Sequence, residues 1–525
     1  MKSIFKPIVL VILDGWGISE KQQGNPLSTA KLPTIDKLNQ FYPHIALQAS
    51  GISVGIPWGE PGNSEVGHLT LGTGQTLYQN LPRITMSIQN GEFFKNHAFL
   101  GAIEHVKKND AAVHIMGLLG KGGIHSNVDH LYGLLELMQD QKFKKVYLHI
   151  FTDGRDCAPT SGTDCIAELQ KRIDGYGVGK IASIGGRYYG MDRNNNWDRV
   201  KLAYDAMTKG TENQIEDPIE YLKKSYKKDI FDEYIEPAVV TEGGKPVATI
   251  KENDSLIFFN FREDRAREIT KAFVLPGFNK FEKAPINNLH FVAMVQYEAD
   301  LPVNDIAFPV VEVNTCLGGV LAENKITQLR IAETEKFAHV TYFFNGGNEE
   351  PFPLEDRLII PSKDVARFDE APEMSAKEIT EKVCDFIKEE KYDFILINYA
   401  NADIIGHTGN EEAAILAVQT VDKCVEELIR NVLSKDGCLL ITADHGNVEE
   451  MISFRTGERN TEHSANPVPL WFITSENHQA SGSAYTFEVS GLLSDIAPTI
   501  LDLLNIKKPA KMSGESLLSF LGYVK

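Results

Sequence analysis

One stretch decides the fold class of this chain: Gly437-Cys438-Leu439-Leu440-Ile441-Thr442-Ala443-Asp444-His445-Gly446-Asn447. A short apolar run that ends in Asp-His and a glycine is typical of a buried parallel strand followed by a sharp turn. Because ligands bind beyond the carboxyl ends of such strands, we expect Asp444 and His445 at the edge of a site. A carboxylate beside an imidazole suits divalent metals such as Mn²⁺ or Zn²⁺, although such a pair is more often only hydrogen-bonded.

The length and composition of the chain limit the classes of protein it can belong to. With 525 residues, the chain exceeds the size at which a single hydrophobic core keeps growing, so two domains are expected. The formal net charge of -19 argues against nucleic-acid binding, and no run approaches the ~18 apolar residues of a membrane span. The six cysteines form no C-x-x-C pair, which indicates a protein of the reducing cytoplasm.

The pattern of an apolar run followed by a carboxylate occurs at two other places. The apolar run 7–13, rich in Val and Ile, is followed by Asp14, which either binds a metal or caps the next loop. A later apolar run leads to Asp403 and His407, which one helical turn or a compact loop can aim at one ion. With His463 in a polar loop further on, these residues favour a divalent-metal site.

A cluster of turn residues precedes a candidate nucleophile in the stretch Pro61-Gly62-Asn63-Ser64-Glu65-Val66-Gly67-His68. This composition predicts a helix that begins at or near Ser64. The backbone N–H groups of a helix N-terminus favour an anion, either an ionised hydroxyl or a phosphate attached to it. The alternative is that Asn63 or Ser64 only caps the helix.

The segment from about residue 77 to 312 resembles a second α/β unit in its pattern. The runs that predict strands there are 113–118, 146–151, 181–184 and 255–259. Arginines follow several of these runs, namely Arg155, Arg187, Arg193, Arg262 and Arg265. Arg262 and Arg265 would share a face if they lie on a helix. Because guanidinium groups bind carboxylate and phosphate bidentately, the set predicts an anion site.

Taken in order, these motifs resemble the cofactor-independent, or 2,3-bisphosphoglycerate-independent, phosphoglycerate mutases. The resemblance runs nearly end to end, and so many matches in one order make it specific. It is carried by Leu13-Asp14-Gly15-Trp16-Gly17, Gly62-Asn63-Ser64-Glu65-Val66-Gly67-His68, Gly123-Ile124-His125-Ser126, Thr152-Asp153-Gly154-Arg155-Asp156, Gly185-Gly186-Arg187-Tyr188-Tyr189, Met191-Asp192-Arg193, Asn260-Phe261-Arg262, Glu335-Lys336, Asn401-Ala402-Asp403 and Thr442-Ala443-Asp444-His445-Gly446-Asn447.

The resemblance implies an α/β fold in which an alkaline-phosphatase-like metal domain is interrupted by a second α/β domain. The metal-binding domain would comprise residues 1–77 and 313–525, and the inserted substrate-binding domain residues 78–312. Two Mn²⁺ or similar ions would be bound, and 2,3-bisphosphoglycerate would not be required. The implied ligands are Asp403, His407 and His463 for one ion and Asp14, Ser64, Asp444 and His445 for the other.

The resemblance also implies a reaction, the interconversion of 3-phosphoglycerate and 2-phosphoglycerate by a monomer. Ser64 would take the phosphoryl group from 3-phosphoglycerate and return it to the other hydroxyl of glycerate. Asp156 would be the base and acid for those hydroxyls, and Lys336 would join them as a catalytic residue. The implied substrate-binding residues are His125, Arg155, Asp156, Arg187, Arg193, Arg262, Arg265 and Lys336.

Two other functions compete with this interpretation. A metal-dependent phosphatase or phosphopentomutase of the same superfamily would share the metal ligands but not the arginines, and Arg155, Arg187 and Arg193 are present. An inactive sensor of sugar-acid phosphates on the same fold would be expected to have lost Ser64 or a metal ligand, and none is missing. The sequence therefore favours the mutase.

Overall fold

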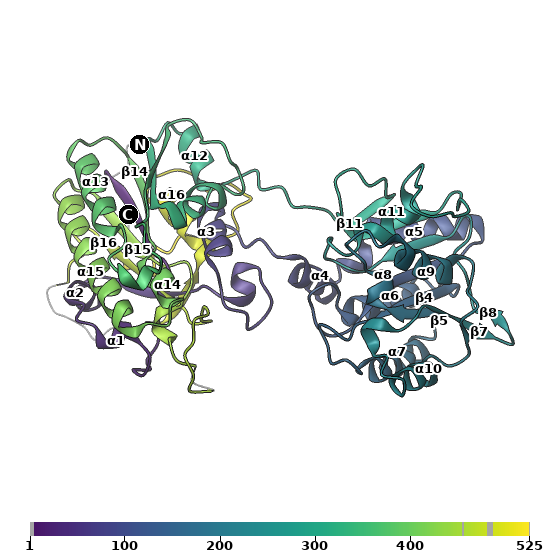
Figure 1. Cartoon of the computed structure of the whole chain (residues 1–525). Helices are drawn as coiled ribbons and strands as arrows, with labels where there is room; N and C mark the ends of the chain where they lie inside the picture. Colours follow the sequence, from purple (N-terminus) through teal and green to yellow (C-terminus); the bar gives the residue numbers. More distant parts are fainter. Residues whose placement is uncertain (1–4, 454–455, 480–486, 524–525) are drawn as a thin grey trace. The chain divides into compact units, whose positions relative to one another are not determined.

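The computed structural model describes residues 5–453, 456–479 and 487–523. The chain divides into two compact units, Met1–Gln79 with Glu312–Lys525 and Asn80–Val311 (Figure 1). We call them the discontinuous unit and the inserted unit. Their borders differ from the expected ones by two residues at the first and one residue at the second.

An eight-stranded sheet lies at the centre of the discontinuous unit, counted over the described residues. The order of its strands in space is β13 (Glu355–Ile360), β12 (Gln328–Glu333), β14 (Phe394–Tyr399), β1 (Ile8–Leu13), β15 (Cys438–Thr442), β16 (Val468–Ile473), β2 (His44–Gln48) and β17 (Val489–Leu492). The strands from β13 to β15 run parallel, β16 is antiparallel to both neighbours, and β17 is parallel to β2.

The three strands β14, β1 and β15 are almost entirely apolar and fully buried. A strand covered on both faces has no polar side, which explains the continuous apolar runs that predicted these strands. In register, Leu13 of β1 is level with Tyr399 of β14, and Ile12 of β1 is level with Thr442 of β15. The polar residues that follow the three strands therefore come together at one edge of the sheet.

Helices cover both faces of this sheet. In Figure 1, α13 and α15 lie on one side of it, and α3 and α16 lie on the other. The helices of the unit are α1 (Pro26–Thr29), α2 (Pro33–Phe41), α3 (Ser64–Thr73), α12 (Leu317–Glu323), α13 (Ala376–Lys388), α14 (Asn401–Gly406), α15 (Glu411–Leu433) and α16 (Ile496–Leu503).

The inserted unit has a nine-stranded sheet of its own and a separate core. Its strands follow the order β11 (Asp305–Phe308), β10 (His290–Val295), β9 (Ser255–Phe258), β3 (Val113–Leu119), β4 (Val146–Thr152), β5 (Lys180–Gly186), β7 (Ala238–Glu242) and β6 (Gln214–Ile215), with β8 (Lys245–Pro246) paired to β7. From β11 to β5 the strands are parallel, so the loops after β3, β4, β5 and β9 leave from one edge.

Eight helices accompany this sheet among the described residues: α4 (Asn80–Gln89), α5 (His97–Asn109), α6 (Val128–Asp140), α7 (Gly162–Tyr176), α8 (Arg187–Gly190), α9 (Trp197–Thr208), α10 (Pro218–Tyr226) and α11 (Arg267–Val274). Arg262 and Arg265 precede α11, so they do not share a helix face. The backbone N–H of Ala266 donates to the carbonyl of Glu263 (3.0 Å), which closes a turn at this point.

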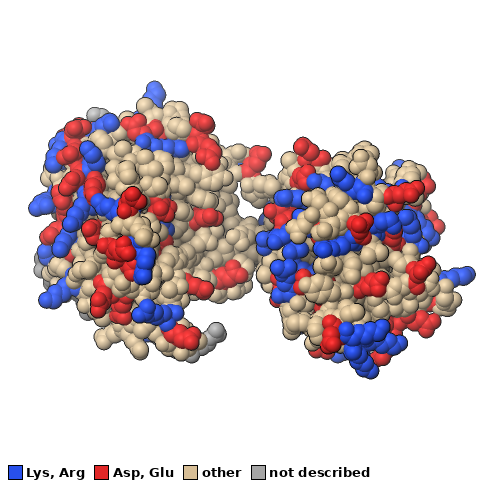
Figure 2. Space-filling view, in the orientation of Figure 1, with Lys and Arg blue, Asp and Glu red and all other residues tan. Residues whose placement is uncertain are grey.

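No helix in the described part of the chain is both long enough and apolar enough to span a membrane. On the face shown in Figure 2, acidic and basic side chains are mixed over both units, and basic side chains gather over α7 and α10.

Candidate active site

Ser64 is the first residue of α3, and its hydroxyl faces a cluster of charged groups. The side chain of Asn63 accepts a hydrogen bond from a backbone N–H in the first turn of α3, so Asn63 is the cap. Ser64 Oγ lies 3.2 Å from Oδ1 of Asp14 and 3.0 Å from Nε2 of His445. It also lies 2.7 Å from Nζ of Lys336. Because Asn63 caps the helix, the Ser64 hydroxyl is not needed as a cap and contacts the charged groups instead.

The close approach of α3 to the edge of the sheet depends on a glycine. A Cβ added to Gly67 would lie 2.6 Å from the carbonyl oxygen of Asp444. A side chain at this position would push the helix, and Ser64 with it, away from the residues that follow β15.

Lys336 lies at the centre of this cluster, in the discontinuous unit. It ends the 3-10 turn Thr334–Lys336 that follows β12. Its Nζ is 2.6 Å from Oδ1 of Asp14 and 2.6 Å from Oδ2 of Asp403. Burial alone would lower the pKa of Lys336, but the two carboxylates raise it above its ordinary value. The buried ammonium is therefore held in its charged form beside the Ser64 hydroxyl.

Asp403, His407 and His463 lie together in the structure; the four-residue spacing predicted this for Asp403 and His407, and the resemblance implied it for His463. Oδ1 of Asp403 lies 3.2 Å from Nε2 of each histidine, and the two Nε2 atoms are 3.1 Å apart. Nδ1 of His407 lies 2.6 Å from the carbonyl of Thr461, and Nδ1 of His463 lies 2.8 Å from that of Gly62. Because a carbonyl only accepts, each Nδ1 carries a proton. The hydrogen bond to Asp403 raises the pKa of His407, and for His463 burial lowers the pKa but the hydrogen bond to Asp403 raises it above its ordinary value.

Once both Nε2 atoms are deprotonated, they and Oδ1 of Asp403 are three acceptor atoms directed at one another, which fits a cation. The same hydrogen bonds from Nδ1 to backbone carbonyls are the ones that orient metal-binding histidines. Carboxylate and imidazole are suitable ligands for Mn²⁺ and Zn²⁺. We conclude that the residues present fit a divalent metal ion.

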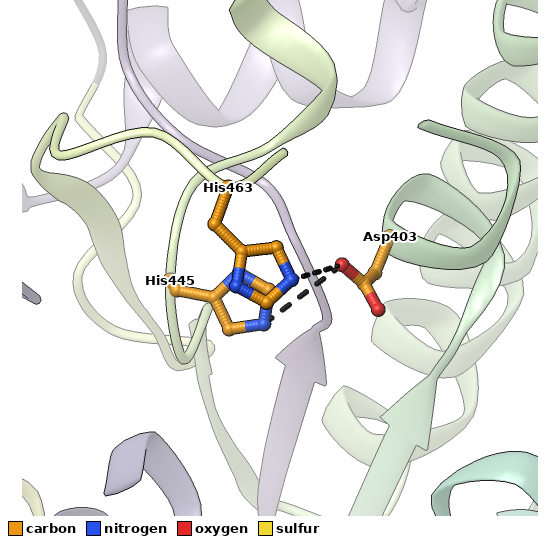
Figure 3. A group of neighbouring side chains, drawn as sticks. All are labelled: Asp403, His445 and His463. Carbon is orange, nitrogen blue, oxygen red and sulfur yellow. Dashed lines mark ion pairs between the residues drawn. The ribbon is translucent and has the colours of Figure 1, made fainter. Parts of the chain in front are cut away.

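His445 lies between this group and the group around Ser64. Figure 3 shows its ring stacked beside that of His463, with both imidazoles directed at Asp403; the ring centroids are 3.9 Å apart. Nε2 of His445 is 3.9 Å from Oδ1 of Asp403. The same nitrogen is 3.6 Å from carboxylate oxygens of both Asp14 and Asp444.

The balance of charge in the cluster also favours cations. Asp14, Asp403 and Asp444 are buried, and the ammonium of Lys336 pairs with Asp14 and Asp403. Burial raises the pKa of Asp14, and the charge of Asp444 raises it further. Burial would also raise the pKa of Asp444, but His445 and His68 lower it below its ordinary value. A divalent ion would offset the excess of buried negative charge.

Two residues near the carboxylates were not singled out from the sequence. Nδ1 of His68 is 3.2 Å from Oδ2 of Asp444. The side-chain N–H of Asn398 donates to Oδ2 of Asp14 (2.7 Å) and lies 3.0 Å from Nε2 of His68. This chain of contacts links the carboxylates of Asp14 and Asp444. His68 is four residues after Ser64, a spacing that puts both on one face of α3 and could have indicated the contact.

In the inserted unit, Arg187 and Asp156 form one ion-paired group. Arg187 begins α8 and is almost fully buried. Its Nη1 is 2.5 Å from Oδ2 of Asp156 and 2.7 Å from Oδ1 of Asp153. Asp153 also accepts hydrogen bonds from the backbone N–H groups of Arg155 and Asp156 (3.2 and 3.0 Å). Asp153 was not predicted, and it holds both the loop after β4 and the guanidinium.

Asp264 joins three of the expected substrate-binding residues. Its carboxylate lies 2.7 Å from Nη1 of Arg193, 3.2 Å from Nε of Arg262 and 3.6 Å from Nδ1 of His125. Burial lowers the pKa of His125 to about 4, and the charge of Arg187 lowers it in the same direction. The imidazole is therefore neutral near pH 7.

The remaining two arginines lie at the margin of this group. Nη1 of Arg265 donates to the backbone carbonyl of Met191 (3.1 Å). Burial lowers the pKa of Arg265, and the charges of Arg187 and Arg193 lower it further. Arg155 is half-exposed, and its Nη1 is 3.5 Å from Oε1 of Glu233. The inserted unit thus gathers guanidinium groups suited to a small polyanion.

One group of side chains fits divalent metal and the other suits a small anion, which together are typical of a metal-dependent enzyme acting on an anionic substrate. A family model described as "BPG-independent PGAM N-terminus" matches residues 84–299. A 2,3-bisphosphoglycerate-independent phosphoglycerate mutase from Clostridium botulinum is 48% identical over 513 residues, which cover 98% of this chain and 99% of that protein. One of the same name from Acetivibrio thermocellus is 48% identical over 514 residues, with the same coverage.

A solved phosphoglycerate mutase from Leishmania mexicana, studied at low cobalt concentration, has a TM-score of 0.50 and 28% identity and covers 97% of both chains. The chain therefore belongs to the family of 2,3-bisphosphoglycerate-independent phosphoglycerate mutases. This membership confirms the family, the fold class and the enzyme class that the sequence predicted.

Proposed function

We propose that this protein interconverts 3-phosphoglycerate and 2-phosphoglycerate through a phosphoserine on Ser64, without 2,3-bisphosphoglycerate. The observation that carries this proposal is the position of the Ser64 hydroxyl. It is buried within reach of the Lys336 ammonium (2.7 Å) and the His445 imidazole (3.0 Å). A serine placed in this way is suited to act as a nucleophile rather than as a helix cap.

We assign two divalent ions, Mn²⁺ by preference, to the discontinuous unit. The residues that would hold them are Asp403, His407 and His463 for one ion and Asp14, Ser64, Asp444 and His445 for the other. Ions bound there would lower the pKa of the serine hydroxyl and neutralise charge on the phosphoryl oxygens. The position of His445 between the two groups is consistent with its assignment beside Ser64.

Lys336 and Ser64 carry the transfer step in this proposal. With ions bound there, the Ser64 hydroxyl would lose its proton to solvent; the Ser64 oxygen then attacks phosphorus, and the bond to the glycerate oxygen breaks. The Lys336 ammonium, fixed by Asp14 and Asp403, donates hydrogen bonds toward the charge that develops on the phosphoryl oxygens. Reversal of the step onto the neighbouring hydroxyl of glycerate gives the isomeric product.

Asp156 and the arginines act on the glycerate part of the substrate. Asp156 takes the proton from the hydroxyl that attacks and supplies one to the oxygen that leaves, and its ion pair with Arg187 fixes its direction. Arg193 and Arg262 bind the glycerate carboxylate in place of Asp264, which holds them in the structure. Retention of glycerate is what distinguishes a mutase from a phosphatase, so this set is the part that a hydrolase would not need.

The test is a metal-return assay on the full-length protein. After chelation with EDTA and dialysis, formation of 2-phosphoglycerate from 3-phosphoglycerate should be absent, and added Mn²⁺ should restore it in a mixture free of 2,3-bisphosphoglycerate. Activity that survives chelation, or that needs added 2,3-bisphosphoglycerate, would refute the proposal. Release of inorganic phosphate in place of 2-phosphoglycerate would identify a phosphatase instead.

A further inference from the structure

Glu449 is a fully buried carboxylate in the 3-10 turn Val448–Glu450, a few residues beyond Asp444 and His445. It is not among the residues assigned to metal, phosphoryl group or glycerate. A buried carboxylate is costly unless every oxygen is hydrogen-bonded, so the identity of its partners indicates why it is there.

Four donors surround the carboxylate of Glu449. Oε2 accepts from the backbone N–H of Gly17 (2.9 Å) and from the backbone N–H of Asn447 (2.9 Å). Oε1 accepts from the side-chain N–H of Asn466 (2.9 Å) and from the hydroxyl of Ser464. Hydrogen bonds to a charged acceptor are stronger than those between neutral groups, so this carboxylate fixes all four donors firmly.

The donors belong to three separate loops, and each loop carries an expected metal ligand. Gly17 is three residues after Asp14, Asn447 is two residues after His445, and Ser464 directly follows His463. Asn447 makes a further link, because its side-chain N–H donates to Oδ1 of Asp403 (3.0 Å).

The shape of the loops gives independent evidence of the same arrangement. A Cβ added to Gly17 would lie 2.3 Å from the carboxyl group of Glu449, and one added to Gly446 would lie 2.4 Å from its Oε1. Both loops therefore close directly onto this carboxylate, at positions where only glycine leaves room. Gly446 also pairs with Ser464 in an isolated β-bridge, which joins the second loop to the third.

We propose that Glu449 is a positioning residue that assembles the metal site by holding the loops of Asp14, His445 and His463 together. The inference rests on the metal assignment proposed above. Groups that support metal ligands through hydrogen bonds, without binding the ion themselves, change metal affinity by about 10- to 100-fold when they are removed. Glu449 does not need to touch the ion, because it sets the distance between ligands that come from distant parts of the chain.

The test is the affinity of the full-length, metal-free protein for Mn²⁺, measured by titration calorimetry or by the paramagnetic resonance signal of free Mn²⁺. Glu449→Gln keeps the shape of the side chain but replaces one acceptor oxygen by a donor. We expect Kd for Mn²⁺ to rise by about 10- to 100-fold. At saturating Mn²⁺, KM for 3-phosphoglycerate should stay within about twofold, since the hydrogen bonds of Glu449 go to the loops of the expected metal ligands and not to the substrate-binding arginines.

Asp422 provides a matched control within the same unit. Its buried carboxylate accepts from the backbone N–H groups of Thr34 (3.1 Å) and Ile35 (2.9 Å), at the start of α2. Neither residue belongs to a loop with an expected ligand. Asp422→Asn should lower stability without changing Kd for Mn²⁺, which separates a positioning role from a general loss of packing.

Three results would contradict the proposed role of Glu449 or the metal site on which it rests. An equal change in Mn²⁺ affinity for Glu449→Gln and Asp422→Asn would overturn the inference. If Glu449→Gln does not fold, Ser464→Ala removes one donor and should still weaken Mn²⁺ binding severalfold; an unchanged Kd would be equally decisive against it. If the unmodified protein binds no Mn²⁺, the proposed metal site itself fails, and that result is distinct from the other two.

Discussion

Ser64 shows how a single residue acquires a role from its surroundings. Its hydroxyl has an anion, a cation and an imidazole as neighbours, in Asp14, Lys336 and His445. Other hydroxyls of α3 have no such setting. Thr70, on the same helix, donates to the backbone carbonyl of Val66 (2.7 Å), as threonines in helices commonly do.

The removal of the Ser64 hydroxyl should therefore stop the reaction without emptying the metal site. We expect Ser64→Ala to reduce formation of 2-phosphoglycerate by on the order of 10³-fold or more, because no other group can accept the phosphoryl group. Mn²⁺ should still bind, since the other expected ligands remain. Thr70→Val, which removes a buried hydroxyl from the same helix, is the control and should retain activity. Substantial turnover by Ser64→Ala would exclude the phosphoserine route.

The residues at strand ends could be predicted as site residues from the sequence, whereas the residues that hold them in place could not. Asp14, Asp403 and Asp444 each follow an apolar run, which is a local signal. Asn398 and Glu449 have none, because their roles depend on loops or strands that are distant in sequence. Such contacts are decided by sheet order and by loop packing, which a single sequence does not display.

At the scale of elements, α6 carries a histidine that is shielded from solvent. His130 is fully buried on α6, and its Nε2 is 3.0 Å from the hydroxyl of Thr85 on α4. Burial lowers the pKa of His130 to about 3. The neutral imidazole is thus part of the contact between the two helices.

This histidine should make the inserted unit sensitive to acid. Between its ordinary pKa near 6.5 and about 3, the unfolded chain binds a proton at this residue and the folded chain does not. As the pH is lowered below 6.5, the free energy of unfolding should therefore decrease by about 1.4 kcal/mol per pH unit because of this group. His130→Gln should remove that part of the slope in urea unfolding measured from pH 7 to 5.

The comparison needs a histidine replaced elsewhere in the same unit. His97→Gln changes an exposed histidine at the start of α5 and should leave the slope of the unmodified protein unchanged. The same slope in His130→Gln and in the unmodified protein would show that the buried imidazole is not the source of the acid sensitivity.

Elements were predicted well where their pattern was strong. The strands β1, β3, β4, β9 and β15 lie where continuous apolar runs placed them, since buried parallel strands have an unmistakable composition. The turn before α11 was not foreseen, because Arg262 and Arg265 have a spacing that fits a helix equally well. The position of Lys336 beside Ser64 could not be predicted from the local sequence pattern either, because it depends on β12 lying next to β14.

At the scale of the whole molecule, the two candidate groups of side chains lie in units that have separate cores. The discontinuous unit carries the acidic cluster and most of the negative excess of the chain, which suits metal ions. The inserted unit is nearly balanced in charge and carries the arginines, which suit an organic anion. The change in sequence pattern near residues 77 and 313 indicated this division, since each core requires its own set of apolar runs.

The arginines differ in how much their substitution would destabilise the inserted unit. Arg187 is buried against Asp153 and Asp156, so its removal would leave two carboxylates without their cation and would destabilise the inserted unit. Arg193 is half-exposed and pairs with Asp264 (2.7 Å). It is therefore the residue whose loss reports on substrate binding rather than on folding.

If Arg193 holds glycerate while Ser64 holds the phosphoryl group, Arg193→Ala should let glycerate escape and water take its place as acceptor. Formation of 2-phosphoglycerate should then fall relative to release of inorganic phosphate by on the order of 10- to 100-fold, the value of a charge-assisted contact. Both products are measured in one reaction mixture. Arg199→Ala, which removes an arginine paired with Asp192 (3.3 Å) outside the expected set, should leave the ratio unchanged. An equal loss of both products in Arg193→Ala, or no loss of either, would mean that the inserted unit does not retain the intermediate.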